Sequence, residues 1–345
     1  MKESYRNNDR LFTQNKIHCY NEYSSNSDNE GADMIAINEP LYPHIQPLDW
    51  ENELFSSRYV RRLKHLAHYG GGALVSSVTH SRFEHTVGVW KLVLHFFPND
   101  LALRAAAILH DIGHLPFSHA VERTLKFNHH QLTNQYIQSN EIAEILNKIN
   151  LQPDDMIQLL DSQSPLMGSE KVLGLDHLDS FLRDNYMNGT LHQSVFSLLE
   201  KISCSNEGIS TDDATVSYLL ELIYKDHQLM LSPLLLAVDR LLAEAVKLHW
   251  PEPEVDFPFY IDSEVTAKLL ESPNPKVKKI IDTLLFEPNK INISETVTGE
   301  GILIQSGKIY GRLPLKNGQS IEHTKEGRGH KEGLASFLKT YEVNI

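Results

Sequence analysis

Apolar residues recur at the spacing of an α-helix along most of this chain, and this periodicity constrains the fold more than any other feature. Residues 50–66 carry the pattern until three glycines at 70–72 interrupt it. Residues 83–97 carry it again until Pro98, and either residue of 99–100 can cap the helix that follows. These segments predict helices joined by tight loops.

The same period continues towards the C-terminus. Ser232 followed by Pro233 is a strong start signal for one of the later helices. We predict the remaining helices at residues 101–109, 118–127, 129–149, 154–160, 176–185, 193–202, 234–249, 263–271 and 274–286. The fold class is therefore mainly α, with an all-helical core.

The residue pattern changes from helical spacing to short, glycine-separated runs near the C-terminus. Three prolines at 251–258 predict a linker, and glycines beyond residue 291 separate short apolar runs such as 302–304 and 309–310, which predict short strands. We therefore divide the chain into three parts. These are a flexible polar N-terminal arm at 1–35, a helical domain at 36–250 and a small α+β domain at 251–345.

Composition and charge exclude several classes of protein. With 345 residues, 41% of them hydrophobic, the chain can bury a sizeable core. Its 32 Lys and Arg stand against 45 Asp and Glu, and this net charge of −13 argues against a nucleic-acid partner. The longest apolar stretch, 229–238, is shorter than the ~20 residues that cross a bilayer. Two cysteines, Cys19 and Cys204, fit a reducing compartment, so we expect a cytoplasmic protein without a membrane partner.

Histidines gather in the segment where we expect the chemistry. Of 18 histidines, three lie with Asp111 in the ten residues 110–119. Imidazole nitrogens and carboxylate oxygens are ligands for divalent ions, and burying Asp111 among apolar residues requires a partner such as a metal. The alternative is an aspartate that is capped or hydrogen-bonded at a helix end.

Two further segments supply single residues of the same kind. His85 lies upstream beside Arg82 and Glu84, and Asp176 lies downstream at the start of a predicted helix. Asp176 taken alone could simply be an N-cap. Together with the doublet of His110 and Asp111, the two residues form an ordered set of four residues whose side chains could bind a metal.

This set resembles the HD-domain metal-dependent phosphohydrolases, whose pattern is a separated His, a His-Asp doublet and a distant Asp on an all-α scaffold. The resemblance extends over roughly residues 40–190 and includes the glycine run, the Ser-Arg-Phe-Glu-His phrase at 81–85 and the segment 110–119. It is most like the deoxynucleoside triphosphate triphosphohydrolase branch, which includes bacterial dGTPases and the human SAM-and-HD-domain enzyme. We therefore identify residues 36–250 as an HD phosphohydrolase domain.

The resemblance implies that His85, His110, Asp111 and Asp176 hold a divalent metal ion. These ligand types suit Mn, Fe, Zn, Co, Ni or Mg and do not select among them. Such an ion lowers the pKa of a water molecule and polarises a phosphoryl oxygen.

The resemblance also assigns histidines to the phosphates and the leaving group. His114 and His129 match residues that face the phosphates, although His130 remains an alternative to His129. His119 and Glu122 stand three residues apart and share a face if this segment is helical, so the carboxylate can orient the imidazole and raise its pKa. The resemblance makes His119 the proton donor to the leaving oxygen.

Two charged residues match substrate contacts of the family. Arg82 matches an arginine that contacts phosphate. The alternative is that its guanidinium group forms a salt bridge to Glu84 or is exposed to solvent. Asp184 matches an aspartate that contacts a sugar hydroxyl, and the alternative is an exposed charge paired with Arg183.

Several substrate-reading positions depart from the triphosphohydrolase pattern. His68 and Tyr69 stand where the human enzyme type has Gln and Leu beside the sugar, and His177 replaces a Lys that meets the triphosphate. Residues 211–228 carry acidic side chains where the family has a helix rich in Arg and Lys. Because a triphosphate normally meets several Lys or Arg, these positions predict weaker triphosphate binding.

The sequence therefore predicts a metal-dependent hydrolase of a nucleotide-type phosphate ester. The reaction is either removal of intact triphosphate from a dNTP or removal of a simple phosphate from a smaller ester. The alternative from another class is a nucleotide-sensing regulatory protein that keeps the fold and the metal. By resemblance we also expect a homo-oligomer.

Overall fold

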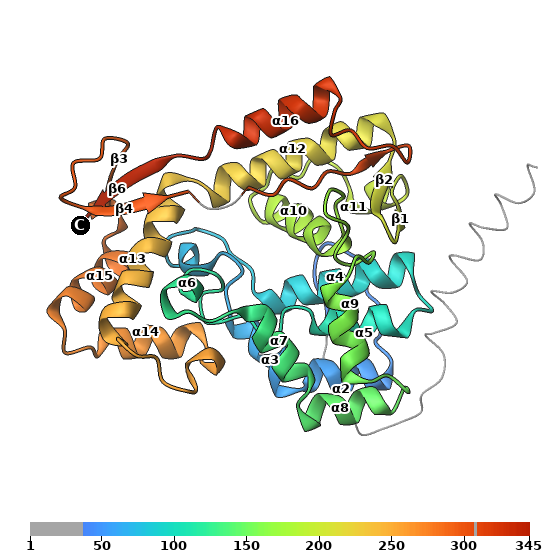
Figure 1. Ribbon diagram of the computed structural model, residues 1–345, viewed down its shortest axis with the longest axis horizontal. Coiled ribbons are helices and arrows are strands. Elements are labelled where there is room, and N and C mark those ends of the chain that lie inside the picture. The colour runs from blue at the N-terminus through green and yellow to red at the C-terminus, as the bar shows by residue number, and fades with distance from the viewer. Residues whose placement is uncertain (1–36, 307–308) are drawn as a thin grey trace, which may run out of the picture.

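The structure is a computed structural model that describes residues 37–306 and 309–345. The predicted N-terminal arm at 1–35, with Cys19, lies outside the described residues. The described chain is mainly helical, as predicted (Figure 1). Within this part of the chain, no helix combines the length and the apolar character that crossing a membrane requires.

Most of the regular structure in the described chain consists of α-helices, with short 3₁₀ turns between some of them. The α-helices are α2 (Asp49–Ser56), α3 (Arg58–Arg62), α4 (Arg82–Phe96), α5 (Leu101–Leu109), α6 (Glu122–Leu125), α7 (His129–Ile137), α8 (Asn140–Asn147), α9 (Pro153–Asp161), α10 (Leu175–Met187), α11 (Val195–Leu199), α12 (Asp213–Met230), α13 (Pro233–His249), α14 (Asp262–Leu270), α15 (Pro275–Phe286) and α16 (Lys325–Ala335). The 3₁₀ turns are η1 (Leu63–His65), η2 (Gly70–Leu74), η3 (Phe257–Phe259) and η4 (Pro288–Lys290).

Helix α4 lies at the centre of the main core and packs against α5 and α10. Its start is fixed by Ser81 and Glu84, because the Ser81 hydroxyl accepts from the Glu84 N–H while the Glu84 carboxylate accepts from the Ser81 N–H at 2.6 Å. Trp90 in the same helix is fully buried, and its Nε1 donates to Glu51 at 2.7 Å. Capping and burial therefore determine where each residue of α4 points.

A buried ion pair holds α2 against α5. Arg104 donates from Nε and Nη2 to the two oxygens of Glu51, at 2.8 and 2.7 Å. Both side chains are at most 3% exposed, so each charge depends on the other for compensation. The pair aligns the helix that ends at the predicted ligand His110.

Gly88 lets α4 and α10 approach closely. A Cβ at this position would lie 2.1 Å from both Asp179 Oδ1 and Arg183 Nη2. Arg183 in turn bonds Asp179 at 2.9 Å and Glu39 at 3.1 Å, and all three side chains are buried. The glycine therefore makes room for a charged contact behind the face of α4 that carries the predicted ligand His85.

A second apolar core joins α13, α14 and α15 with Phe117 and Val121. Helix α13 packs on the glycine turn η2, where a Cβ on Gly71 would lie 2.8 Å from Asp239 Oδ1. Asp239 Oδ1 accepts from the Gly71 N–H at 2.8 Å. This core connects the glycine run of the N-terminal half with the helices beyond residue 250.

Two small sheets complete the described fold. Strands β1 (Ser203–Ser205) and β2 (Gly208–Thr211) are antiparallel, and β5 (Leu315–Lys316) adds to β2 in parallel. Strand β6 (Thr340–Asn344) lies between β3 (Asn292–Ser294) and β4 (Ile302–Gln305), antiparallel to both. Helix α16 lies along α12 (Figure 1). The C-terminal segment thus returns to the helical body, and the boundary at residue 250 stays a prediction.

The structure corrects several predicted elements. Residues 118–127 form only the short α6, because Phe117 and Ser118 have positive φ angles of 57° and 54° and turn the chain. The predicted helix 129–149 is divided into α7 and α8, since Ser139 caps the second. Residues 309–310 do not form a strand. The predicted linker at 251–258 is not simply an exposed connection, because its Phe257 is buried in the core.

Burial gives Asp239 a measurable effect on stability. Burial raises the pKa of Asp239 from its ordinary value to about 7, against bonds from the Gly71 and Gly72 N–H groups. The folded state therefore holds a proton that the unfolded chain releases, and this contribution, up to about 4 kcal/mol, is lost as pH rises from about 4 through 7. We expect Asp239→Asn to gain stability relative to wild type between about pH 4 and about pH 7 in urea unfolding. Parallel pH profiles of the two proteins would contradict this assignment.

Candidate metal centre

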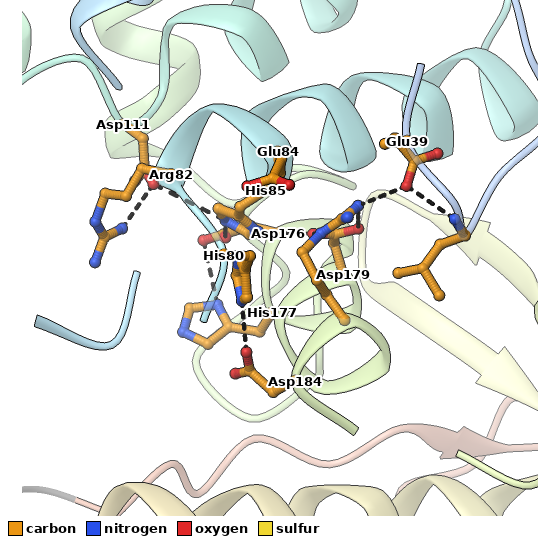
Figure 2. A network of polar contacts seen from close by, with 12 residues as sticks. Glu39, His80, Arg82, Glu84, His85, Asp111, Asp176, His177, Asp179 and Asp184 are labelled. Carbon is orange, nitrogen blue, oxygen red and sulfur yellow. Dashed lines mark hydrogen bonds and ion pairs between the residues drawn. The ribbon is translucent and has the colours of Figure 1, made fainter. Parts of the chain in front are cut away.

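Three helices bring together the four predicted metal ligands. His85 lies in the first turns of α4, the doublet of His110 and Asp111 follows the end of α5, and Asp176 is in the first turn of α10. Figure 2 shows His85, Asp111 and Asp176 gathered at this meeting point. At most 14% of any of the four side chains is exposed.

The ring nitrogens of two histidines converge. His85 Nε2 lies 3.3 Å from His110 Nε2 and 3.1 Å from Asp176 Oδ1. His110 Nε2 lies 3.7 Å from the same Asp176 oxygen and 3.6 Å from Asp111 Oδ1. The two rings are inclined at 71°, so they do not stack.

The opposite ring nitrogens are both occupied by acceptors. His85 Nδ1 donates to Asp179 Oδ2 at 2.8 Å, and His110 Nδ1 donates to the Ala107 carbonyl at 2.8 Å. In neutral rings this fixes the protons on Nδ1 and leaves both Nε2 lone pairs facing one another. Two lone pairs and the Asp176 carboxylate repel one another unless a cation lies among them.

The electrostatics favour positive charge at this point. Burial opposes the charged form of His85, but the hydrogen bonds to Asp176 and Asp179 outweigh burial and raise its pKa to about 10. Burial also opposes ionisation of Asp176, yet His177 and His85 hold its pKa well below the usual value. The donor set, its fixed ring tautomers and its charge therefore fit a divalent metal ion.

Asp111 connects this centre to Arg82 and His114. Arg82 Nη1 donates to Asp111 Oδ2 at 2.7 Å, and His114 Nε2 lies 3.1 Å from Asp111 Oδ1. Burial raises the pKa of Asp111, but Arg82, His110 and His114 together outweigh burial and hold the pKa well below its usual value. Arg82 bonds Asp111 instead of forming the alternative salt bridge to Glu84, because the Glu84 carboxylate caps the start of α4.

The histidines assigned to the phosphates form a second cluster. His129 stacks on His114 with ring centroids 4.4 Å apart, and His119 packs edge-on against both. Glu122 accepts from Nδ1 of His129 at 2.8 Å and from Nδ1 of His119 at 3.0 Å. The structure thus places His129 in this cluster and leaves His130 exposed.

Two expectations for His119 are corrected. The contact with Glu122 forms, but in a turn, because helix α6 begins only at Glu122. Partial loss of hydration where the ring packs on His114 and His129, together with the nearby Arg82 cation, outweighs the bond to Glu122, so the pKa of His119 lies below its ordinary value. The His119 side chain is 61% exposed, so a leaving group can reach it.

The residues assigned to the sugar side form a buried polar cluster. His80 Nε2 bonds Asp184 Oδ1 at 2.7 Å, as Figure 2 shows, and His68 stacks on His80 at 4.5 Å. Asp184 is 2% exposed and contacts Asp226 of α12, so it is not an exposed partner of Arg183. Burial raises the pKa of Asp184 to about 6, and burial together with Asp184 raises that of Asp226 well above its ordinary value.

His177 and Tyr69, the two remaining predicted substrate contacts, lie in different parts of the site. His177 Nδ1 is 3.2 Å from Asp176 Oδ2, and its ring stacks on Tyr310 at 4.1 Å. Tyr69 packs against His80, and its hydroxyl accepts from Asn188 at 3.0 Å. Tyr69 is therefore part of the sugar-side cluster.

The sequence interpretation missed several residues of this site. Asp179 orients His85, Ser118 accepts from Arg82 Nε at 2.7 Å, and Asp226 adjoins Asp184. The spacing of Asp179 and Arg183 by four residues was a usable local signal for a charged helix face. Ser118 and Asp226 gave none, because their partners lie 36 and 42 residues away along the chain.

Comparisons with known proteins agree with this geometry. Residues 82–179 match the family model described as HD domain. The chain is 28% identical over 224 residues to an uncharacterized protein of Mycoplasma pneumoniae, covering 56% of this chain and 51% of that protein. It is 30% identical over 173 residues to an uncharacterized protein of Methanocaldococcus jannaschii, covering 46% of this chain and 35% of that one.

An enzyme with a named activity is among the similar proteins. The chain is 27% identical over 157 residues to the deoxynucleoside triphosphate triphosphohydrolase SAMHD1 of Homo sapiens, covering 38% of this chain and 25% of that enzyme. The chain spans about half or less of the length of these relatives.

Removal of one carboxylate tests the centre without an activity assay. We expect wild-type protein to retain one manganese ion per chain after dialysis and Asp176→Ala to lose it, because Asp176 faces both Nε2 atoms. Elemental analysis by mass spectrometry measures this. Asp161→Ala, the same change at the exposed end of α9, is the matched control. Equal metal content in all three proteins would contradict the assignment.

Proposed function

The chain carries an HD domain, and from this and the geometry of its histidines and aspartates we propose that it is a metal-dependent phosphohydrolase acting on a nucleotide-type phosphate ester. The observation that carries the proposal is the approach of His85 Nε2 to His110 Nε2 at 3.3 Å, with both Nδ1 atoms bonded to acceptors. His85, His110, Asp111 and Asp176 would hold the ion. When bound, the ion supplies a Lewis acid for a phosphoryl oxygen and lowers the pKa of a water molecule.

Arg82 would bind the phosphate. Its guanidinium is fixed by Asp111 at 2.7 Å and by Ser118 at 2.7 Å, so it is oriented before a substrate arrives. A planar cation that is already held in place stabilises charge on phosphoryl oxygens without reorganisation. His114, which contacts Asp111, and His129, which stacks on His114, would face the phosphates on the same side.

His119 would transfer the proton to the leaving oxygen. Glu122 accepts from its Nδ1, so proton transfer takes place at the other nitrogen, Nε2. The pKa of the free ring lies below the ordinary value, but a phosphate anion beside it favours the protonated form. Exposure of this side chain allows the leaving group to approach from solvent.

Two substrate classes fit this site. The named activity of the human relative favours release of intact triphosphate from a dNTP. A specific feature favours the second class, a smaller phosphate monoester, because His177 stands where the family has a Lys that meets the triphosphate, and one face of its ring is stacked on Tyr310. The cytoplasmic location and the homo-oligomer remain predictions from the sequence.

Product analysis decides between the two classes. Manganese-loaded protein is incubated with a mixed pool of dNTPs, NTPs and nucleoside monophosphates, and every product is identified by mass. Nucleoside plus tripolyphosphate establishes the first class, and orthophosphate from monophosphates alone establishes the second. We expect Asp111→Ala to lose both metal and turnover because it removes a ligand and the partner of Arg82. Turnover retained by this variant refutes the proposed site, and nucleotide binding without turnover in wild type supports the sensing alternative.

The role of His119 predicts a dependence on the leaving group. We expect His119→Gln to lower kcat by roughly 10²–10⁴ for esters with a basic leaving oxygen. Esters of p-nitrophenol, whose leaving group needs no proton, should lose much less. His130→Gln changes an exposed neighbour of the cluster and serves as the control. An equal loss on both kinds of ester would exclude proton donation by His119.

A further inference from the structure

Asp262, the first residue of α14, joins two loops that lie far apart in the sequence. Its Oδ2 accepts from the Ala67 N–H at 2.7 Å, and its Oδ1 accepts from the Phe117 N–H at 2.7 Å. The start of α14 itself does not need this carboxylate, because Glu264 accepts from the Ile261 N–H at 2.9 Å. The two bonds therefore serve the loops rather than the helix.

The loop at Phe117 and Ser118 is strained. Both residues have positive φ angles, 57° and 54°, which residues other than glycine rarely adopt. The Ser118 hydroxyl donates to the Ala67 carbonyl at 2.7 Å. Asp262, Phe117, Ser118 and Ala67 thus close a ring of contacts that holds the turn in its left-handed conformation.

The ring of contacts ends at the phosphate-binding arginine. Ser118 Oγ, while donating to Ala67, accepts from Arg82 Nε at 2.7 Å. Arg82 Nη1 is then directed to Asp111 Oδ2 at 2.7 Å. The orientation of Arg82 therefore depends on the place of Ser118, which in turn depends on the turn that Asp262 holds.

Arg62 forms a second link between the start of α14 and the loop that carries His114. Arg62 Nη1 donates to the Tyr260 carbonyl at 2.9 Å, and its Nη2 donates to the His114 carbonyl. The segment 260–262 is thus bonded on both sides of the loop that carries His114 and Ser118. This fixes the position from which Asp262 acts.

We propose that Asp262 is a positioning residue, which holds the turn at Phe117 and Ser118 so that Ser118 orients Arg82 towards the substrate phosphate. The proposal rests on the proposed function, because it assumes that Arg82 binds phosphate. It gives a residue of the predicted C-terminal domain a role in the site that the helical domain forms.

Inorganic phosphate is the probe, and titration calorimetry of the full-length manganese-loaded protein is the measurement. In Asp262→Asn an amide NH₂ replaces one acceptor and faces a backbone N–H. We expect unchanged manganese content, about tenfold weaker phosphate binding and up to a hundredfold lower kcat with a smaller change in KM. Arg82→Gln should weaken phosphate binding, and the double variant should be no weaker than Arg82→Gln alone.

The controls separate positioning from general damage. Asp282→Asn, an exposed change on α15, should bind phosphate like wild type. If Asp262→Asn does not fold, Asp262→Glu keeps the charge while moving the acceptor oxygens, and the same loss of phosphate affinity is expected. Additive losses in the double variant, or full phosphate affinity in a folded Asp262 variant, overturn this inference alone. A wild-type protein that binds no phosphate overturns it together with the proposed function.

Discussion

The approach of two imidazole nitrogens is the constraint on which the rest of the structure depends. His85 and His110 come from different helices, yet their Nε2 atoms are 3.3 Å apart and face the Asp176 carboxylate. Such an arrangement persists only if both rings are held from behind. Asp179 holds one ring and the Ala107 carbonyl holds the other, and Gly88 provides the space in which Asp179 lies. The packing of α4 against α5 and α10 therefore serves this one convergence.

Buried charge around the centre is compensated in successive layers. Asp179 orients His85 but is itself paired with Arg183, which also contacts Glu39. Glu39 accepts in turn from Lys91 at 3.0 Å. Each member has a partner of opposite charge, so removal of one leaves another buried and unpaired. This explains why a mainly helical core contains so many ionised side chains directly behind the site.

The sequence predicted the parts of the site that depend on local pattern. The mainly helical fold and the HD-domain resemblance are confirmed, because helical period and the His-Asp doublet are visible within short windows. The division of residues 118–127 into a turn and a short helix was not predictable, since it depends on positive φ angles held by distant partners. Asp262 lies 145 residues from Phe117, and no periodicity reports such a contact. The roles of the individual site residues stay predictions.

The segment beyond residue 250 is hydrogen-bonded to the loops beside the proposed metal centre. Here the Tyr260 carbonyl accepts from Arg62, and Asp262 accepts from both loops beside the centre. Tyr310 also covers His177 from the far end of the chain, and its N–H donates to His227 at 2.9 Å. Through Ser118 and His177 these contacts reach residues that we propose to lie beside the substrate, so the segment beyond residue 250 is bonded to the substrate side of the proposed site.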